Sequence, residues 1–254
     1  MPVPEDVLTD RIERFSGHFR AELDQIAAIN GESGRTFRKL LYLAVLDALS
    51  KCVSGPTDYK NVERFVAFVS NFSGWPDGQR VSLTHLVALL DRDPNPAFDR
   101  VREKARAMLT AWTPMRSREV FITEDPLPSD LDADWPRASD GKLMPIWKVR
   151  LEQLTHYRLL WAHRNRLAHE LRVPGQGVDS GHLYSPFYHE LTTYSLGDRD
   201  KPPTLTIELV YPDVFLLRLC RDAVTNLHRY LFQNKVDPYE GYKFGTFWIE
   251  ELNS

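Results

Sequence analysis

The segment from Gly34 to Gly55 most constrains how this chain can fold. Its centre, Leu40 to Leu46, places apolar residues on every side of the helix that the segment predicts. A helix of this kind has to be covered by other elements, so we expect it in the middle of a helical fold rather than on its edge. Asp47 directly follows and interrupts the apolar run.

Helical spacing of apolar residues recurs along most of the chain. Two local signals mark helix starts, namely Ser82 as a capping residue and Asn95 followed by Pro96. The longest predicted helix ends at Pro174-Gly175, because proline and glycine stop helices. This longest helix covers residues 143–173, and the other predicted helices besides the central one cover residues 5–29, 58–72, 83–93, 96–112 and 213–234.

Two stretches depart from this pattern. Residues 182–196 and 204–211 are rich in aromatic and β-branched residues and are separated by a turn-like "GDRDKPP", which predicts an inserted β-hairpin over 182–211. From 113 to 141 the periodicity disappears, and the four prolines and the run "SDLDAD" predict an irregular insert that is functional or partly mobile. The sequence therefore predicts a mainly α fold, a helical bundle with an inserted β-hairpin and a long acidic, proline-rich loop.

We expect residues 1–254 to form a single domain, the alternative being a division near residue 113. A hydrophobic fraction of 43% with 26% charged residues is enough for a packed core. The formal net charge of −3 gives no general attraction to nucleic acid, so any contact with nucleic acid has to come from a local basic patch. The N-terminus lacks the pattern of a signal peptide and no apolar run is long enough to cross a membrane, so we expect a cytoplasmic protein.

The cysteines and histidines do not indicate a disulfide or a metal site. Cys52 and Cys220 lie far apart in apolar helical patterns, where a free thiol behaves as a small hydrophobic residue. His182 and His189 flank the hairpin, and neither has cysteines or carboxylates at the spacing of metal ligands. We therefore expect no metal and no cofactor.

The stretch "RNRLAHE", Arg164 to Glu170, carries the main functional hypothesis. An arginine precedes a histidine by five positions three times in the chain, as Arg80/His85, Arg158/His163 and Arg164/His169. The first pair straddles a helix start, which places His85 at the edge of the core, and the second has no polar partner beside its histidine. In the third pair Asn165 lies four residues before His169, so the two are neighbours on one helix face.

This stretch resembles the R-N-x-x-x-H motif of the HEPN superfamily, which comprises helical-bundle ribonucleases and toxins of prokaryotic defence systems and some RNA-processing enzymes. The resemblance is specific over about 12 residues, whereas over the rest of the chain only the helical architecture is similar. It implies that Arg164, Asn165 and His169 are the active-site residues. A polar residue of an earlier helix often joins them in that family, and Asp47 is the position that matches here.

The resemblance implies metal-independent cleavage of RNA. His169 would act as general base or acid, a role that suits an imidazole because histidine titrates near neutral pH. Arg164 would donate to the phosphoryl oxygens where negative charge grows, and Asn165 would orient the imidazole or bind the phosphate. The nucleophile would be the RNA's own 2′-oxygen, so the products would be a 2′,3′-cyclic phosphate and a 5′-hydroxyl, and DNA would be bound but not cut.

Members of this family usually build the cleft across a two-fold homodimer, with the motif helices facing each other. Such a dimer would double the local positive charge, to which Arg158 and Arg172 would contribute as RNA-binding residues and His163 and Arg166 as supporting residues. The resemblance also implies a toxin or an abortive-infection effector against phage, controlled by an antitoxin or an activator protein.

Other interpretations of the same residues stay open. Arg164 and Arg166 can form a solvated helix face that pairs with Glu170, and His169 can be a capping or core histidine near the end of its helix. The chain can be a catalytically silent HEPN-like bundle that binds a partner protein or a nucleotide, with the acidic loop 124–134 as the docking element. It can also be a helical scaffold unrelated to that family.

Overall fold

A computed structural model describes residues 4–31, 33–54, 61–112, 119–172, 183–193 and 204–242 of the chain. The predicted fold class is confirmed, because helices account for most of the described residues and the strands form one small sheet. The buried apolar side chains form a core cluster to which residues from Leu8 to Leu231 contribute.

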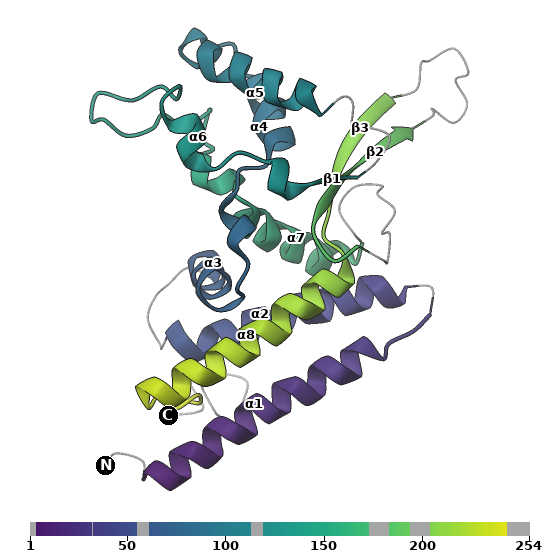
Figure 1. The fold of residues 1–254 in the computed structure, drawn as a ribbon, viewed down its shortest axis with the longest axis vertical. Coiled ribbons are helices and arrows are strands. Elements are labelled where there is room, and N and C mark those ends of the chain that lie inside the picture. Colours follow the sequence, from purple (N-terminus) through teal and green to yellow (C-terminus); the bar gives the residue numbers. More distant parts are fainter. Residues whose placement is uncertain are drawn as a thin grey trace.

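Three long helices form one end of the molecule (Figure 1). These are α1 (Glu5–Ala27), α2 (Gly34–Ser54) and α8 (Asp213–Asn234), and α8 packs against both of the others. Leu43, Leu46 and Leu49 of α2 are completely buried. The central position predicted for this helix is therefore confirmed, although the exposed Leu41 shows that it is not covered on every side.

The shorter helices lie toward the other end of the molecule (Figure 1). Among them, α7 packs against both α2 and α3 and therefore joins the two ends. The α-helices here are α3 (Asn61–Phe72), α4 (Leu83–Leu90), α5 (Asp99–Ala111), α6 (Pro128–Asp132) and α7 (His156–Glu170), and the 3₁₀ helices are η1 (Pro76–Gln79), η2 (Pro96–Phe98), η4 (Ile122–Glu124) and η5 (Leu151–Leu154).

The two predicted helix caps differ in outcome. Asn95 caps as predicted, because its side-chain oxygen accepts a hydrogen bond from the backbone N–H of Ala97 over 3.0 Å. Ser82 precedes α4 but makes no capping bond among the described residues. Instead, Oδ1 of Asp125 accepts from the backbone N–H of Leu83 over 2.8 Å, so the cap comes from a residue 42 positions away.

Residues 119–141 of the predicted acidic insert pack against the rest of the fold, while 113–118 lie outside the described residues. Leu131 and Trp135 of this segment are buried in the core. Oxygens of Asp134 accept from Arg100 over 2.5 Å and from Lys104 over 2.8 Å. The acidic side chains are therefore used in internal ion pairs, which hold the segment against α5.

The longest predicted helix is wrong over its first half. Residues 143–150 are irregular, with Ile146 and Val149 bonded to each other through their backbones, and α7 begins only at His156. Pro145 cannot donate a helical hydrogen bond and Trp147 has a left-handed φ of 55°, so neither residue fits a continuous helix. The helix ends at Glu170, before the predicted stop at 174–175, which lies outside the described residues.

The predicted hairpin is confirmed. Strands β2 (Phe187–Thr193) and β3 (Thr204–Val210) pair antiparallel, while residues 173–182 and 194–203 lie outside the described residues. A third strand, β1 (Val120–Phe121), pairs with β2 and makes the order β1-β2-β3. The acidic segment and the hairpin, predicted as separate inserts, thus share one sheet.

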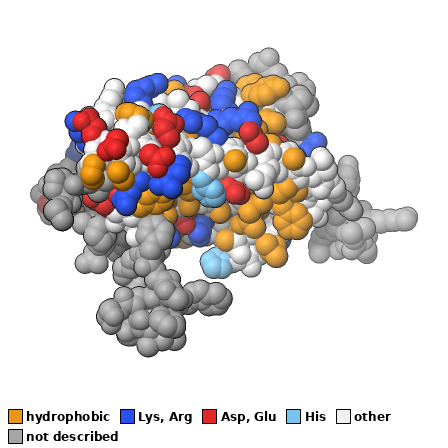
Figure 2. Space-filling model, turned by 90° about the horizontal axis from the view of Figure 1, so that it is seen from below, with side chains coloured by type: hydrophobic (Ala, Val, Ile, Leu, Met, Phe, Trp, Pro, Cys, Tyr) orange, Lys and Arg blue, Asp and Glu red, His pale blue; other side chains and the backbone are white. Residues whose placement is uncertain are grey.

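At the end of the molecule that carries α1, the described residues form no continuous basic surface. Figure 2 shows this face, on which Lys and Arg side chains alternate with Asp and Glu and apolar groups lie between them. Several of these cations are paired, including Arg14 with Asp10, Arg221 with Asp24 and Lys235 with Glu5.

The remaining predictions concern thiols and the membrane. Cys52 and Cys220 are free and buried, as expected from their apolar surroundings. No helix in the described ranges is both long and apolar enough to cross a membrane.

Candidate functional site

Helix α7 carries most of the predicted site residues and presents them in different directions. Successive residues of an α-helix turn by about 100°, so Arg164 and Arg166 leave the helix about 200° apart. Arg164 lies on the side that packs against α2 and α3, whereas Arg166 and His163 line a cavity beside α4 and β3. The structure therefore divides the predicted residues between two sides of one helix.

The structure brings Arg164 and Asp47 together. Nη2 of Arg164 donates to Oδ2 of Asp47 over 2.8 Å, and both side chains are largely buried. The guanidinium also lies 5.1 Å from the centre of the Trp161 ring, a cation–π contact that further fixes its position. Arg164 is therefore held in place by α2 and by its own helix.

A second guanidinium shares the same carboxylate. Nη2 of Arg64, from α3, donates to Oδ1 of Asp47 over 3.0 Å, and its Nε donates to the Ser50 hydroxyl over 2.9 Å. Asp47 thus lies between two arginines, and one negative charge opposes two positive charges. No sequence pattern indicated Arg64, because its contact with Asp47 depends on how α2 and α3 pack.

Asn165 joins this cluster and His169 does not. Oδ1 of Asn165 accepts from Nη1 of Arg164 over 3.1 Å. His169 follows one turn after Asn165 and is exposed near the end of α7, about 140° around the helix from Arg164. Within the described residues no hydrogen bond links Arg164 to His169, so a substrate or a second chain would have to bring the two groups onto one phosphate.

The structure places His163, predicted as a supporting residue, in a buried position apart from Arg164. Its side chain is buried with only 6% of the residue exposed, and it packs edge-on against the Tyr211 ring. Burial, reinforced by the nearby Lys39 ammonium, lowers the pKa of His163 to about 3. The imidazole is therefore neutral at physiological pH and cannot belong to a basic patch. Arg166 is exposed but lies on this side of α7, away from Arg164.

The predicted RNA-binding arginines are already paired with carboxylates. Arg158 donates to Glu63 of α3, and Arg172 donates to Glu170 over 2.8 Å. Glu170 therefore pairs with Arg172, and not with Arg164 or Arg166 as in the alternative interpretation of a solvated helix face. These ion pairs also reduce the positive potential expected from the arginines of α7.

A cavity of about 380 Å³ lies on the other side of α7. Its walls combine apolar and ionisable side chains, and Nε2 of His163 has no hydrogen-bond partner among the described residues. Burial also lowers the pKa of His85, which lies at this cavity. The lining residues are His85, Leu159, Ala162, His163, Arg166, Ile207, Glu208, Leu209 and Tyr211.

A buried hydrogen-bond network lies behind this cavity and was not predicted. Oδ2 of Asp125 accepts from the Tyr188 hydroxyl over 2.6 Å and lies 2.7 Å from Nε2 of His156. Nδ1 of His156 lies 3.1 Å from the Tyr211 hydroxyl. The Ser82 hydroxyl extends the network to Tyr188 and to Nδ1 of His85, at 2.8 Å each.

This network raises the pKa of both tyrosines well above the ordinary value, mainly through burial and then through the charge of Asp125. Tyr188 and Tyr211 therefore keep their protons, and they act as hydrogen-bonding partners rather than as nucleophiles. No sequence signal indicated the network, since Asp125 falls in the segment without periodicity. No group of histidine, cysteine and carboxylate side chains suited to a metal ion occurs in the described ranges.

Comparisons with known proteins do not add to this geometry. Searches with protein-family models, among curated proteins and among solved structures found no match to this chain.

Proposed function

We propose that this protein is a metal-independent endoribonuclease whose active site lies on the Arg164 side of α7. The observation that carries the proposal is the contact of Arg164 with Asp47 and Asn165. The resemblance to the R-N-x-x-x-H motif implies that these residues belong to one active site. Asp47 and Arg164 meet although 117 positions separate them in the chain. A guanidinium fixed in advance is suited to a developing oxyanion, because it needs little reorganisation when charge appears.

The proposed reaction needs no added water or oxidant. The 2′-oxygen of a ribose attacks the adjacent phosphorus while its proton passes to an imidazole, and the bond from phosphorus to the 5′-oxygen breaks. The leaving 5′-oxygen takes a proton from an acid, which leaves a 2′,3′-cyclic phosphate and a 5′-hydroxyl. Arg164 binds the phosphoryl oxygens as their negative charge increases, and His169 supplies the base or the acid.

Two proton transfers call for two acid–base groups, and each chain offers one exposed histidine in the motif. We therefore propose a homodimer in which the α7 helices of two copies face each other and a histidine from each copy serves one phosphodiester. The second copy also adds its own Arg164 to the cleft, which increases the local positive charge there. The biological role that fits is a toxin or an anti-phage effector whose activity is controlled by an antitoxin or by an activator protein.

The test is cleavage of a generic single-stranded RNA in the presence of a metal chelator. Wild-type protein should cut, and Arg164→Ala and His169→Ala should each lower the rate on the order of 10²-fold or more. His18→Ala, which removes an exposed histidine of α1, is the matched control and should keep full activity. Chelator-resistant activity that is equal in all four proteins would reject the site.

A silent HEPN-like bundle that binds a partner protein or a nucleotide is the second candidate. The ion pairs of Arg158 and Arg172 favour it, because a surface whose cations are already neutralised attracts RNA weakly. Its acidic docking element is not supported, since Asp125 is buried and Asp134 is paired internally. Expression in bacteria separates the two candidates, as only the nuclease predicts slowed growth that His169→Ala relieves.

A further inference from the structure

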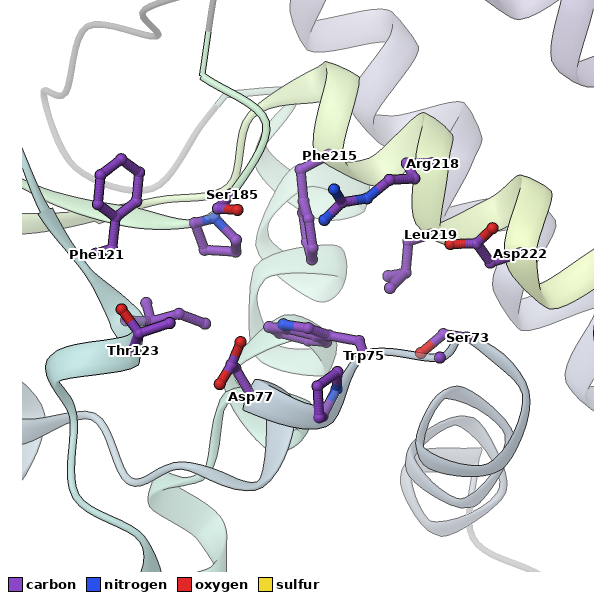
Figure 3. A pocket seen from close by; sticks show the side chains of 14 residues that line it. Ser73, Trp75, Asp77, Phe121, Thr123, Ser185, Phe215, Arg218, Leu219 and Asp222 are labelled. Atoms are coloured by element: carbon purple, nitrogen blue, oxygen red, sulfur yellow. The ribbon is translucent and has the colours of Figure 1, made fainter.

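A cavity of about 520 Å³ lies away from the α7 motif, between the first half of α8 and the segment that joins α3 to α4 (Figure 3). Residues 121–123 and 185–186 close its remaining side. Four segments that are distant in sequence thus converge on one hollow. Pockets of this size hold small molecules, and such sites combine apolar walls with a few polar groups.

Two opposite charges of α8 face this cavity. Arg218 and Asp222 are four residues apart, so they lie one turn apart on the same helix face. Figure 3 shows both side chains projecting from α8 toward the segment that carries Trp75 and Asp77. Neither forms an ion pair within the described residues, whereas Asp77 already pairs with Arg80 over 2.9 Å. One guanidinium and one carboxylate are therefore available to a ligand.

The wall opposite α8 is aromatic and offers a hydrogen-bond donor. Trp75 is only 6% exposed, and its indole N–H donates to no acceptor in the described part of the chain. The Trp75 ring packs edge-on against the Phe215 ring. The guanidinium carbon of Arg218 lies over the same Phe215 ring, 6.0 Å from its centre. Phe121 adds a partly exposed ring on the side of the sheet. The indole N–H itself is not fully buried, so a polar ligand atom in the cavity is able to accept a hydrogen bond from it.

We infer that this cavity binds a free α-amino acid with an apolar side chain, held as a zwitterion between Arg218 and Asp222. The carboxylate of the ligand accepts hydrogen bonds from the guanidinium, and its ammonium donates to Asp222. The apolar side chain packs against the rings of Trp75 and Phe121.

The charge arrangement distinguishes this ligand class from simpler ions. A purely anionic ligand on Arg218 would face the carboxylates of Asp222 and Asp77, and a purely cationic ligand on Asp222 would face an unpaired guanidinium. Like charges brought together in a partly desolvated pocket oppose binding. A zwitterion satisfies both side chains at once, and charge-assisted hydrogen bonds are stronger than neutral ones.

Three related probes test the inference with the full-length protein. L-Phenylalanine carries both charges, N-acetyl-L-phenylalanine keeps only the carboxylate, and L-phenylalaninamide keeps only the ammonium. Binding is measured by calorimetry and by ligand-observed NMR. We expect L-phenylalanine to bind and each derivative to bind about tenfold more weakly or worse. No binding of L-phenylalanine up to about 10 mM, or equal binding of the three probes, would overturn the inference.

Variants of α8 locate the site. Arg218→Gln and Asp222→Asn should each weaken L-phenylalanine binding about tenfold, because each removes one charged partner. Arg229→Gln, which removes an exposed arginine of α8 outside the cavity, is the matched control and should bind as wild type does. All three positions are exposed, and thermal unfolding checks that the variants fold.

Equal binding by wild type, Arg218→Gln and Asp222→Asn would place the ligand elsewhere and refute the assignment. Binding is read directly and without RNA, so a negative result leaves the ribonuclease proposal untouched, and loss of nuclease activity does not affect this one.

Discussion

Asp47 and Arg164 form an ion pair of 2.8 Å between α2 and α7, although 117 residues separate them in the chain. Arg64 binds the other oxygen of the same carboxylate. The three side chains join three helices at one point, and the proposed active site depends on this junction.

Removing the carboxylate at this junction should affect both stability and activity. We expect Asp47→Asn to lower the free energy of unfolding by about 1–3 kcal/mol, because two largely buried guanidinium groups lose their counter-charge. RNA cleavage should fall less than in Arg164→Ala, since the arginine remains but is less well fixed. Urea unfolding and the cleavage rate measure the two effects.

Asp24→Asn is the matched control, because it removes an exposed carboxylate paired with Arg221 and should change stability by less than about 0.5 kcal/mol. Asp47→Asn with wild-type stability and activity would show that the junction is not important.

The buried network around Asp125 should contribute strongly to stability. Tyr188→Phe removes a buried hydroxyl that contacts Asp125 and Ser82, so we expect a loss of about 1–3 kcal/mol. Asp125→Asn should cost more, since it disturbs the contacts to Tyr188 and His156 and weakens the cap of α4. Denaturant unfolding measures the loss of stability in both variants, and Asp132→Asn, which changes an exposed carboxylate, serves as the control. If Tyr188→Phe cost more than Asp125→Asn, the carboxylate would not be the centre of the network.

His163 should make the folded protein less stable in acid. Burial lowers its folded pKa to about 3, whereas an unfolded histidine titrates near 6.5. Between these values the unfolded chain binds more protons, so the stability that His163 contributes is complete above pH 6.5 and is lost progressively as the pH falls toward 3.

In wild type, the uptake of up to one proton on unfolding makes the free energy of unfolding fall by up to about 1.4 kcal/mol for each pH unit between pH 7 and pH 5. We expect His163→Leu to remove this contribution, so that the free energy of unfolding depends less steeply on pH. The measurement is urea unfolding at half-unit pH steps, and His18→Leu, at an exposed position, should leave the wild-type slope. An unchanged slope in His163→Leu would mean that this imidazole titrates normally in the folded protein.

Local sequence patterns identified the elements that depend on local spacing. The run around Leu43 and Leu46 predicts a central helix because its apolar residues face several directions, and α2 is buried there. The aromatic and β-branched residues on either side of the turn-like "GDRDKPP" predict the hairpin, because strand propensity and turn signals are local properties. Residues 143–155 were misassigned as helix, since periodicity alone did not take account of Pro145 and of the backbone at Trp147.

The chemistry at each site was decided by tertiary packing. The motif of Arg164, Asn165 and His169 is readable from the sequence, but the carboxylate partner and the second arginine depend on how α2, α3 and α7 meet. The sequence placed His163 beside that motif, yet helix geometry turns it away from Arg164 and tertiary packing buries it as a neutral group. Charge state follows from burial and from neighbours brought together over long chain separations, so the sequence determined which ionisable groups exist and only the fold decided which of them act together.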